Sequence, residues 1–151
     1  MREAKSGRIL IERLAKGADL LPALTGICVR EGITHGEVWA IGALARARVA
    51  YYDQTARRYK TLDIPEPCEI VSLVGNISLK DGEPFVHAHL AVGDEKGHVF
   101  GGHLVEGCEV FAAEYVIREY LVAAHLERTY DEPTGLALWK SEAGCQRSEQ
   151  R

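Results

Sequence analysis

Polar and apolar residues alternate near the N-terminus, in residues 8–14 (RILIERL). Successive side chains of a β-strand point to opposite faces, so this alternation predicts a strand with one face in water. The next segment, LLPALTGICVRE, instead places apolar residues on one helical face between residues 20 and 28. Asp19 can cap this helix and Gly32 can end it. We therefore expect one helix whose apolar face lies on a sheet.

From residue 37 onward, short runs rich in Val, Ile and Tyr alternate with turn residues, a pattern typical of strands. The predicted strands are EVWAIGAL, RARVAYYD, YKTLDI, CEIVSLVGNISL, FVHAHLAVG, HVFGGHLV and EVFAAEYVIREYL. Three short connections contain turn residues, PEP (65–67), KDGEP (80–84) and DEKG (94–97), so we expect neighbouring strands to pair. Residues 115–126 also suit a helix, and beyond residue 131 the pattern fades.

These elements predict an α+β protein with one main helix packed on a largely antiparallel sheet. The chain has 151 residues, of which 46% are hydrophobic and 26% charged, as in an ordinary globular domain. We place one domain at residues 1–140. Residues 141–151 (SEAGCQRSEQR) are polar, and we predict a frayed tail there.

The cysteines and the lack of long apolar runs bear on location. No run approaches the roughly 20 residues of a membrane-spanning helix, and the N-terminus lacks the pattern of a secretory signal. Cys28, Cys68, Cys108 and Cys145 form no CxxC pair. We interpret them as three small buried hydrophobes and one tail thiol, all reduced, and we expect a cytoplasmic protein without membrane contact.

The charge of the chain disfavours nucleic acid as its main partner. The formal net charge is −4 and the sequence pI is about 5.9, which is the wrong sign for binding a phosphate backbone. Five basic residues nevertheless lie close together: Arg46, Arg48, Arg57, Arg58 and Lys60. No aromatic platform or recognition helix accompanies them, so we interpret them as a solvated strand face.

Three histidines form the main candidate site. His87 and His89 are two residues apart in a predicted strand, so both imidazoles project from one face. His103 lies in the next predicted strand. Three neutral nitrogens without a thiolate suit Zn²⁺, Ni²⁺ or Fe²⁺, and a fourth position left to water is the pattern of an open site. We favour zinc.

Whether His103 joins the other two depends on the hairpin register. A three-residue loop at residues 95–97, with its glycine in the left-handed conformation, places His103 opposite His89. A two-residue loop places His103 opposite Ala88 and turns it to the other face, unless a bulge at residues 101–102 restores it. Those two residues are glycines, which leave room for an ion with its water or ligand. The remaining histidines, His35, His98 and His125, do not join this pattern, and we expect them at the surface.

The segments CEIVSLVGNISLKDGEPFVHAHLAV, DEKGHVFGGHLVEG and AEYVI resemble the signature of the Plants and Prokaryotes Conserved (PPC) domain family. The order of elements agrees over most of the chain, through GEVWAIGAL to ERTYDEPTGLALW. The resemblance implies a curved antiparallel sheet, a homotrimer, and metal binding by the motif histidines His87, His89 and His103. Family members are provisionally named DNA-binding proteins, but this chain has no Arg-Gly-Arg AT-hook, the segment that plant relatives attach to the domain.

The fold and the three histidines are also similar to those of acetolactate decarboxylase and a related zinc-dependent ester hydrolase. That similarity implies that a metal here can polarise a carbonyl or acidify bound water. Glu69, Glu109 and Glu114 lie on predicted neighbouring strands and are candidates for a base or a partner of a ligand.

Three functions are therefore in question. We rank first a non-catalytic, metal-stabilised trimer that binds a small ligand or a protein partner. The second is a metal-dependent lyase or hydrolase acting on a small carboxylate or ester. The third is direct DNA binding.

Overall fold

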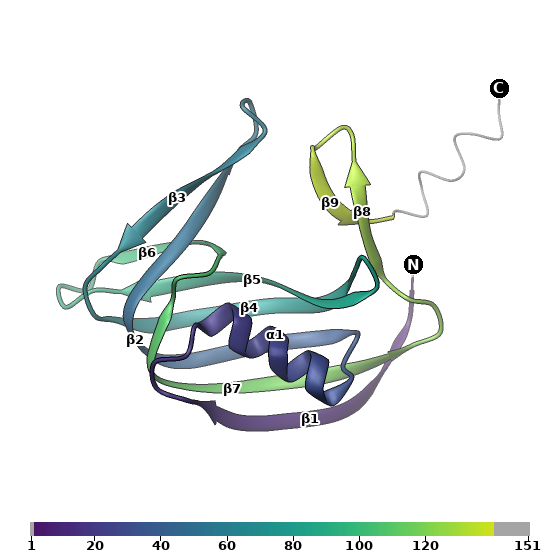
Figure 1. Cartoon of the computed structure of the whole chain (residues 1–151), viewed down its shortest axis with the longest axis horizontal. Coiled ribbons are helices and arrows are strands. Elements are labelled where there is room, and N and C mark those ends of the chain that lie inside the picture. Colours follow the sequence, from purple (N-terminus) through teal and green to yellow (C-terminus); the bar gives the residue numbers. More distant parts are fainter. Residues whose placement is uncertain (1, 141–151) are drawn as a thin grey trace.

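The computed structural model describes residues 2–140 and folds them into one helix and one nine-stranded sheet. The elements are β1 (Ala4–Leu14), α1 (Leu20–Glu31), β2 (Gly36–Asp53), β3 (Arg58–Ile64), β4 (Cys68–Lys80), β5 (Glu83–Gly93), β6 (Val99–Leu104), β7 (Glu109–Val122), β8 (Glu127–Asp131) and β9 (Leu136–Trp139). Figure 1 shows the sheet curving around α1, which lies across one face. The predicted α+β class, with a curved and largely antiparallel sheet, is confirmed.

The sheet is built around β2, which is paired along both edges. One edge carries β3 at residues 47–53 and β4 at residues 36–44. The other edge carries β6 at residues 49–50 and β7 at residues 36–46. All four pairings are antiparallel, and β5 joins β4 to β6, so that β2, β4, β5 and β6 close into a ring. The prediction that PEP turns β3 back onto β4 is wrong, because both strands pair with β2.

β2 also replaces two strands that the sequence pattern predicted separately. It runs unbroken for 18 residues, with register shifts near Gly42 and between Leu44 and Arg46. Gly42 has φ 135°, and a Cβ at this position would collide with the carbonyl oxygen of Ala112. The glycine therefore allows the strand to bend without ending.

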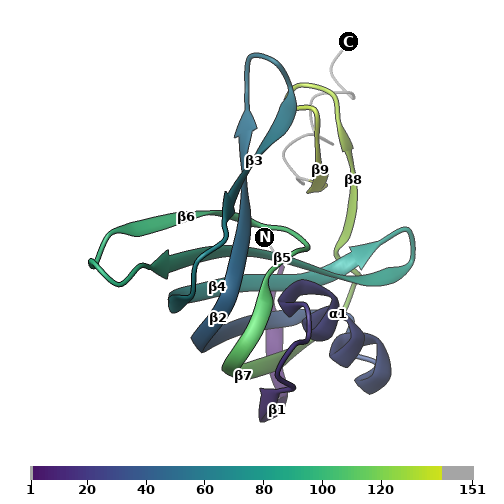
Figure 2. The same ribbon diagram turned by 60° about the vertical axis from the view of Figure 1, so that its left-hand side comes forward.

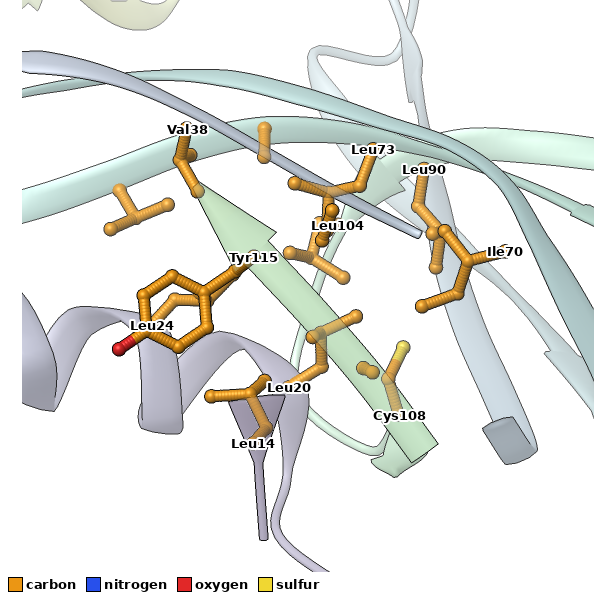
Figure 3. Close-up of a cluster of buried hydrophobic side chains, with 14 of the residues drawn as sticks. Leu14, Leu20, Leu24, Val38, Ile70, Leu73, Leu90, Leu104, Cys108 and Tyr115 are labelled. Atoms are coloured by element: carbon orange, nitrogen blue, oxygen red, sulfur yellow. The ribbon is translucent and has the colours of Figure 1, made fainter. Parts of the chain in front are cut away.

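The apolar face of α1 forms the core with the inner face of the sheet. Leu20, Leu24, Ile27 and Cys28 are buried, as the spacing predicted. Figure 3 shows the first two among sheet residues that include Leu73, Leu90, Leu104 and Tyr115. The thiols Cys28, Cys68 and Cys108 are buried and free, as predicted, whereas Cys145 lies outside the described residues.

Of the two caps predicted for α1, the C-terminal cap is confirmed and the N-terminal cap is not. Gly32 ends the helix in the left-handed conformation, with φ 65°, as expected. Asp19 does not cap the helix through its side chain. Its carboxylate instead accepts hydrogen bonds from the N–H groups of Gly107 (2.6 Å) and Cys108 (3.3 Å), so that it ties the start of α1 to the β6–β7 connection.

The C-terminal third contains strands that the pattern did not predict. β7 remains a strand to Val122, so the helical alternative for residues 115–126 is wrong. β8 then pairs parallel to β4, and β9 pairs antiparallel to β8. The predicted tail at residues 141–151 lies outside the described residues. Within residues 2–140, no helix is both long and apolar enough to cross a bilayer.

Two hairpins project from the face opposite α1, as Figure 2 shows: the outer part of β2 with β3, and β8 with β9. Their tips touch. The Tyr52 hydroxyl donates to the carbonyl of Thr134 (2.9 Å), and the Arg57 guanidinium donates to the carbonyls of Glu132 and Pro133 (3.2 Å each). We call these two hairpins, residues 47–64 and 127–139, the hairpin arch.

Candidate metal centre

The register of the β5–β6 hairpin brings the three histidines together. His89 lies directly opposite His103. The loop has three residues, because the N–H of Asp94 donates to the carbonyl of His98 (3.0 Å) and Gly97 is left-handed with φ 79°. The three-residue alternative is therefore confirmed, and the two-residue alternative is excluded. His87, two positions before His89, faces the same side.

The three rings are close enough to share an ion. One nitrogen from each of His87, His89 and His103 lies within 4.8 Å of the other two. The ring centroids are 4.9 Å apart for His87 and His103, 5.5 Å for His87 and His89, and 5.8 Å for His89 and His103. Ligand nitrogens on a tetrahedral ion lie about 3.3 Å apart, given bonds of about 2.0–2.1 Å. Holding an ion therefore requires the rings to move closer together.

The electrostatic setting favours the neutral form of His87 and His103, which is the form that binds metals. The pKa of His87 is lowered to about 4, first by burial and then by the positive charge of Arg128 and by the two other imidazoles. Burial also lowers the pKa of His103, with smaller contributions from His89 and Arg128. His87 and His103 are half-buried, and His89 is exposed.

The centre lies on the outer face of the sheet, under the hairpin arch. Val74 pairs with His89 and Asn76 pairs with His87, so these β4 side chains share that face. From the arch, Tyr59 stacks on His103 with ring centroids 5.0 Å apart.

Arg128 is a site residue that the sequence reasoning missed. It comes from β8, is only 8% exposed, and lies 5.5 Å from the ring of Phe85 and 5.3 Å from that of Trp139. Its Nη2 lies 3.2 Å from Nδ1 of His87. Burial lowers the pKa of the guanidinium. No periodicity marks this residue, because its surroundings combine β9 with two strands distant in sequence, β4 and β5.

A cavity of about 500 Å³ opens beside the centre. His87 and His89 form part of its wall, and His35, Glu37 and Trp139 line other parts. Sites for small ligands have volumes of this order. Glu37 was not a predicted site residue, although it is the carboxylate that lines this cavity, and its Oε1 lies 3.0 Å from Nη1 of Arg118.

The prediction that His35 lies at the surface is wrong. It is 2% exposed, and its Nε2 accepts a hydrogen bond from the N–H of Leu126 (2.8 Å). Burial lowers its pKa, which favours this neutral acceptor form. His98 and His125 are exposed, as predicted. His35 thus holds the β7–β8 connection that leads to Arg128.

The three predicted carboxylates lie away from the histidines. Glu109 is paired with Arg46 (3.3 Å), Glu69 lines a separate groove with Phe111, and Glu114 is exposed on β7. None of the three lines the cavity beside the histidines. A catalytic role for them stays an untested prediction.

The sequence profile of the Plants and Prokaryotes Conserved domain matches residues 1–121. The chain belongs to this family. The PPC resemblance is therefore confirmed, and Arg128 lies beyond the matched segment.

Solved structures of PPC relatives share the fold. A metal-containing protein of Archaeoglobus fulgidus, AF0104, is 39% identical with a TM-score of 0.88, and the match covers 93% of this chain and 99% of that chain. A PPC protein of Pyrococcus horikoshii is 41% identical with a TM-score of 0.87, over 92% of this chain and 95% of that chain. A Bacteroides thetaiotaomicron protein, provisionally named as DNA-binding, is 27% identical with a TM-score of 0.82, over 93% and 97%.

The PPC segment also occurs within longer proteins. Bifunctional protein GlmU of Synechococcus sp. strain JA-3-3Ab is 32% identical over 129 residues, which is 85% of this chain and 20% of that protein. A second Synechococcus GlmU is 32% identical over 124 residues, which is 82% of this chain and 18% of that protein. The chain thus spans about a fifth of the length of these curated relatives.

Proposed function

We propose that this PPC-family protein is a homotrimeric module that holds a zinc ion through His87, His89 and His103 and uses it to bind a small ligand or a partner protein. The observation that carries this proposal is the convergence of three imidazole nitrogens within 4.8 Å on the outer face of the sheet.

The donor set suits a divalent transition metal. Two of the rings have lowered pKa values and are neutral near pH 7, and no thiolate contributes to the cluster. Zinc accepts such nitrogen ligands in a tetrahedral arrangement with one open position. The description of the Archaeoglobus fulgidus relative as metal-containing supports this choice. A bound ion here would supply Lewis acidity to a ligand oxygen.

An apolar row on the outer face supports the homotrimer. Cross-strand pairing aligns Ile11, Val116, Trp39 and Val74 in one row that continues into His89. Ile11 is 74% exposed, Trp39 44% and Val74 63%. Large apolar side chains that adjoin one another at a surface favour an interface. Further copies of this chain are the proposed occupants, and light scattering after size exclusion should give three times the chain mass.

A cytoplasmic location is also part of the proposal. The support is the state of the thiols: Cys28, Cys68 and Cys108 are buried and unpaired, which suits a reducing compartment.

The metal centre is tested by measuring bound metal per chain after purification and dialysis. We expect about one zinc per chain, and a loss of zinc affinity in each of His87→Ala, His89→Ala and His103→Ala that exceeds the roughly 10–100-fold typical of changes to groups that only support a ligand. His98→Ala is the matched control, because it alters an exposed histidine of the same hairpin. Equal zinc binding by the control and the three variants would refute the centre.

A metal-dependent lyase or hydrolase acting on a small carboxylate or ester is the second candidate. The cavity of about 500 Å³ beside His87 and His89 favours it, and the predicted resemblance to acetolactate decarboxylase motivates it. The zinc-loaded protein should then turn over a panel of esters and 2-hydroxy-3-keto acids. If the zinc-loaded protein is inactive toward the whole panel, the enzyme is refuted and the non-catalytic binding module is favoured.

Direct DNA binding is the third candidate, supported by the provisional name of the Bacteroides thetaiotaomicron relative. The basic residues of β2 and β3 are exposed, as predicted, and three of them face carboxylates: Arg46 with Glu109, Arg48 with Asp63, and Lys60 with Asp53. These ion pairs reduce the net positive charge that the basic residues of β2 and β3 could present to DNA. A gel shift at low salt tests the proposal, and no binding there removes it.

A further inference from the structure

Arg128 is a buried cation without an anionic partner among residues 2–140. It is the one buried lysine, arginine, aspartate or glutamate among the described residues. Its four acceptors are all neutral: Ser78 Oγ (3.1 Å), the Ala137 carbonyl (3.1 Å), Asn76 Oδ1 (2.7 Å) and His87 Nδ1 (3.2 Å). No carboxylate within residues 2–140 forms an ion pair with it. Buried charges are usually paired, and the described part of the chain supplies no negative charge to this one.

The contact with His87 excludes a simultaneous metal bond. A guanidinium can only donate, so Nδ1 of His87 must accept and carries no proton. A neutral imidazole has one lone pair in its ring plane, on the nitrogen without a proton. While that lone pair accepts the hydrogen bond from Arg128, His87 has no second lone pair with which to bind an ion. This holds whichever ring nitrogen points toward the other two histidines. Metal binding therefore requires Nη2 of Arg128 to release His87.

The release leaves two positive groups side by side. A divalent ion on the histidines adds charge next to a guanidinium that has just lost an acceptor. Nη2 of Arg128 is hydrogen-bonded to Asn76 and His87, and both of these residues line the cavity. An anion entering from the cavity can take up the released N–H and reach the ion. A carboxylate suits this role, because one of its oxygens can accept a hydrogen bond from the guanidinium while the other reaches the ion.

We propose that Arg128 is the anion-binding residue of this site, and that a small carboxylate bridges it to the metal, so that metal and carboxylate bind cooperatively. This inference rests on the proposed metal centre. Cooperativity follows because each ligand removes an obstacle to the other: the metal frees the Arg128 donor, and the carboxylate offsets the repulsion between the two positive groups.

The wild-type protein provides the first test, with glycolate as the probe and uncharged glycolamide as its matched control. Zinc affinity is measured by competition with a chromophoric chelator. We expect saturating glycolate to raise zinc affinity about tenfold, in the usual range of coupling between sites, and glycolamide to leave it unchanged. The visible spectrum of the cobalt-loaded protein should change with glycolate only.

Variants of Arg128 provide the second test. Arg128→Met keeps a long side chain between Phe85 and Trp139 but removes the charge. Its zinc affinity without glycolate should exceed that of wild type several-fold, and the glycolate effect should vanish. Arg128→Lys should keep part of the effect. Arg57→Met is the control for loosening of the hairpin arch, since Arg57 bonds only to carbonyls of the β8–β9 turn, and it should retain the full glycolate effect.

The outcomes separate this inference from the metal centre. If wild-type protein binds no zinc, the metal centre fails and the inference fails with it. If zinc binds but glycolate changes nothing, or glycolamide acts equally, only the role of Arg128 is overturned. Should Arg128→Met not fold, Arg128→Lys takes its place, and a glycolate effect as large as that of wild type in this variant would overturn the role of Arg128.

Discussion

The two faces of the curved sheet differ in what fills them. The inner face meets α1 and is closed by apolar side chains such as Leu24, Leu73 and Leu90, none of which is more than 1% exposed. The outer face carries three imidazoles, a buried guanidinium and the hairpin arch, together with a cavity of about 500 Å³. Cross-strand pairing puts these features on opposite sides of the same strands. The core and the proposed binding site therefore lie on different faces, so that each can be altered separately.

Truncation on the inner face should have the largest effect. Leu90→Ala removes a side chain that is 1% exposed, and we expect it to lower the free energy of unfolding by about 2–5 kcal/mol. Urea denaturation measures this loss. Val71→Ala, at a residue that is 55% exposed, is the control and should change stability by less than about 0.5 kcal/mol. Zinc affinity should be equal in both folded variants, and a large loss in Leu90→Ala would contradict the division between faces.

Acidification should act through the outer face, with a smaller effect. The pKa of His87 is about 4 in the folded protein and near 6.5 when unfolded, so the unfolded chain holds more protons between these values. Stability of the metal-free protein should therefore fall as the pH drops from about 6.5 to about 4. We expect His87 to contribute about 1–2 kcal/mol of this loss, because solvent screens part of the interaction of a half-buried ring.

Urea denaturation at several pH values checks this, with chelator present throughout. His87→Gln should flatten the dependence on pH. If the free energy of unfolding of His87→Gln depends on pH as strongly as that of wild type, protonation of His87 does not cause the loss of stability.

Opening the hairpin arch should have the smallest effect on folding. Tyr52→Phe removes the hydroxyl that donates to Thr134, which should cost about 0.5–1.5 kcal/mol or less, because the bond is partly exposed. The sheet core is untouched, so hydrogen exchange should rise in β8 and β9 and stay constant in β5. Tyr51→Phe, at a residue that is 68% exposed, is the matched control. Faster exchange throughout the sheet would show that the arch supports the core.

The histidine centre was accessible from sequence for local reasons. Alternation along one strand put His87 and His89 on the same face, and the loop DEKG, with its left-handed Gly97, fixed the register that adds His103. Arg128 and Glu37 were not accessible in this way. Arg128 meets His87 only because β8 runs parallel to β4, a pairing between segments almost 50 residues apart that leaves no periodic signal.

The features that depend on short-range geometry could be predicted from the amino-acid sequence: the helix, most of the strands, and the hairpin that aligns the three imidazoles. Only the folded sheet shows which carboxylate lines the cavity beside the histidines, why His35 is buried, and how the guanidinium of Arg128 comes to lie next to His87. The physical reason is that alternation and turn conformation act over a few residues. The burial of a charge or a ring depends instead on strands that meet only after the sheet has closed.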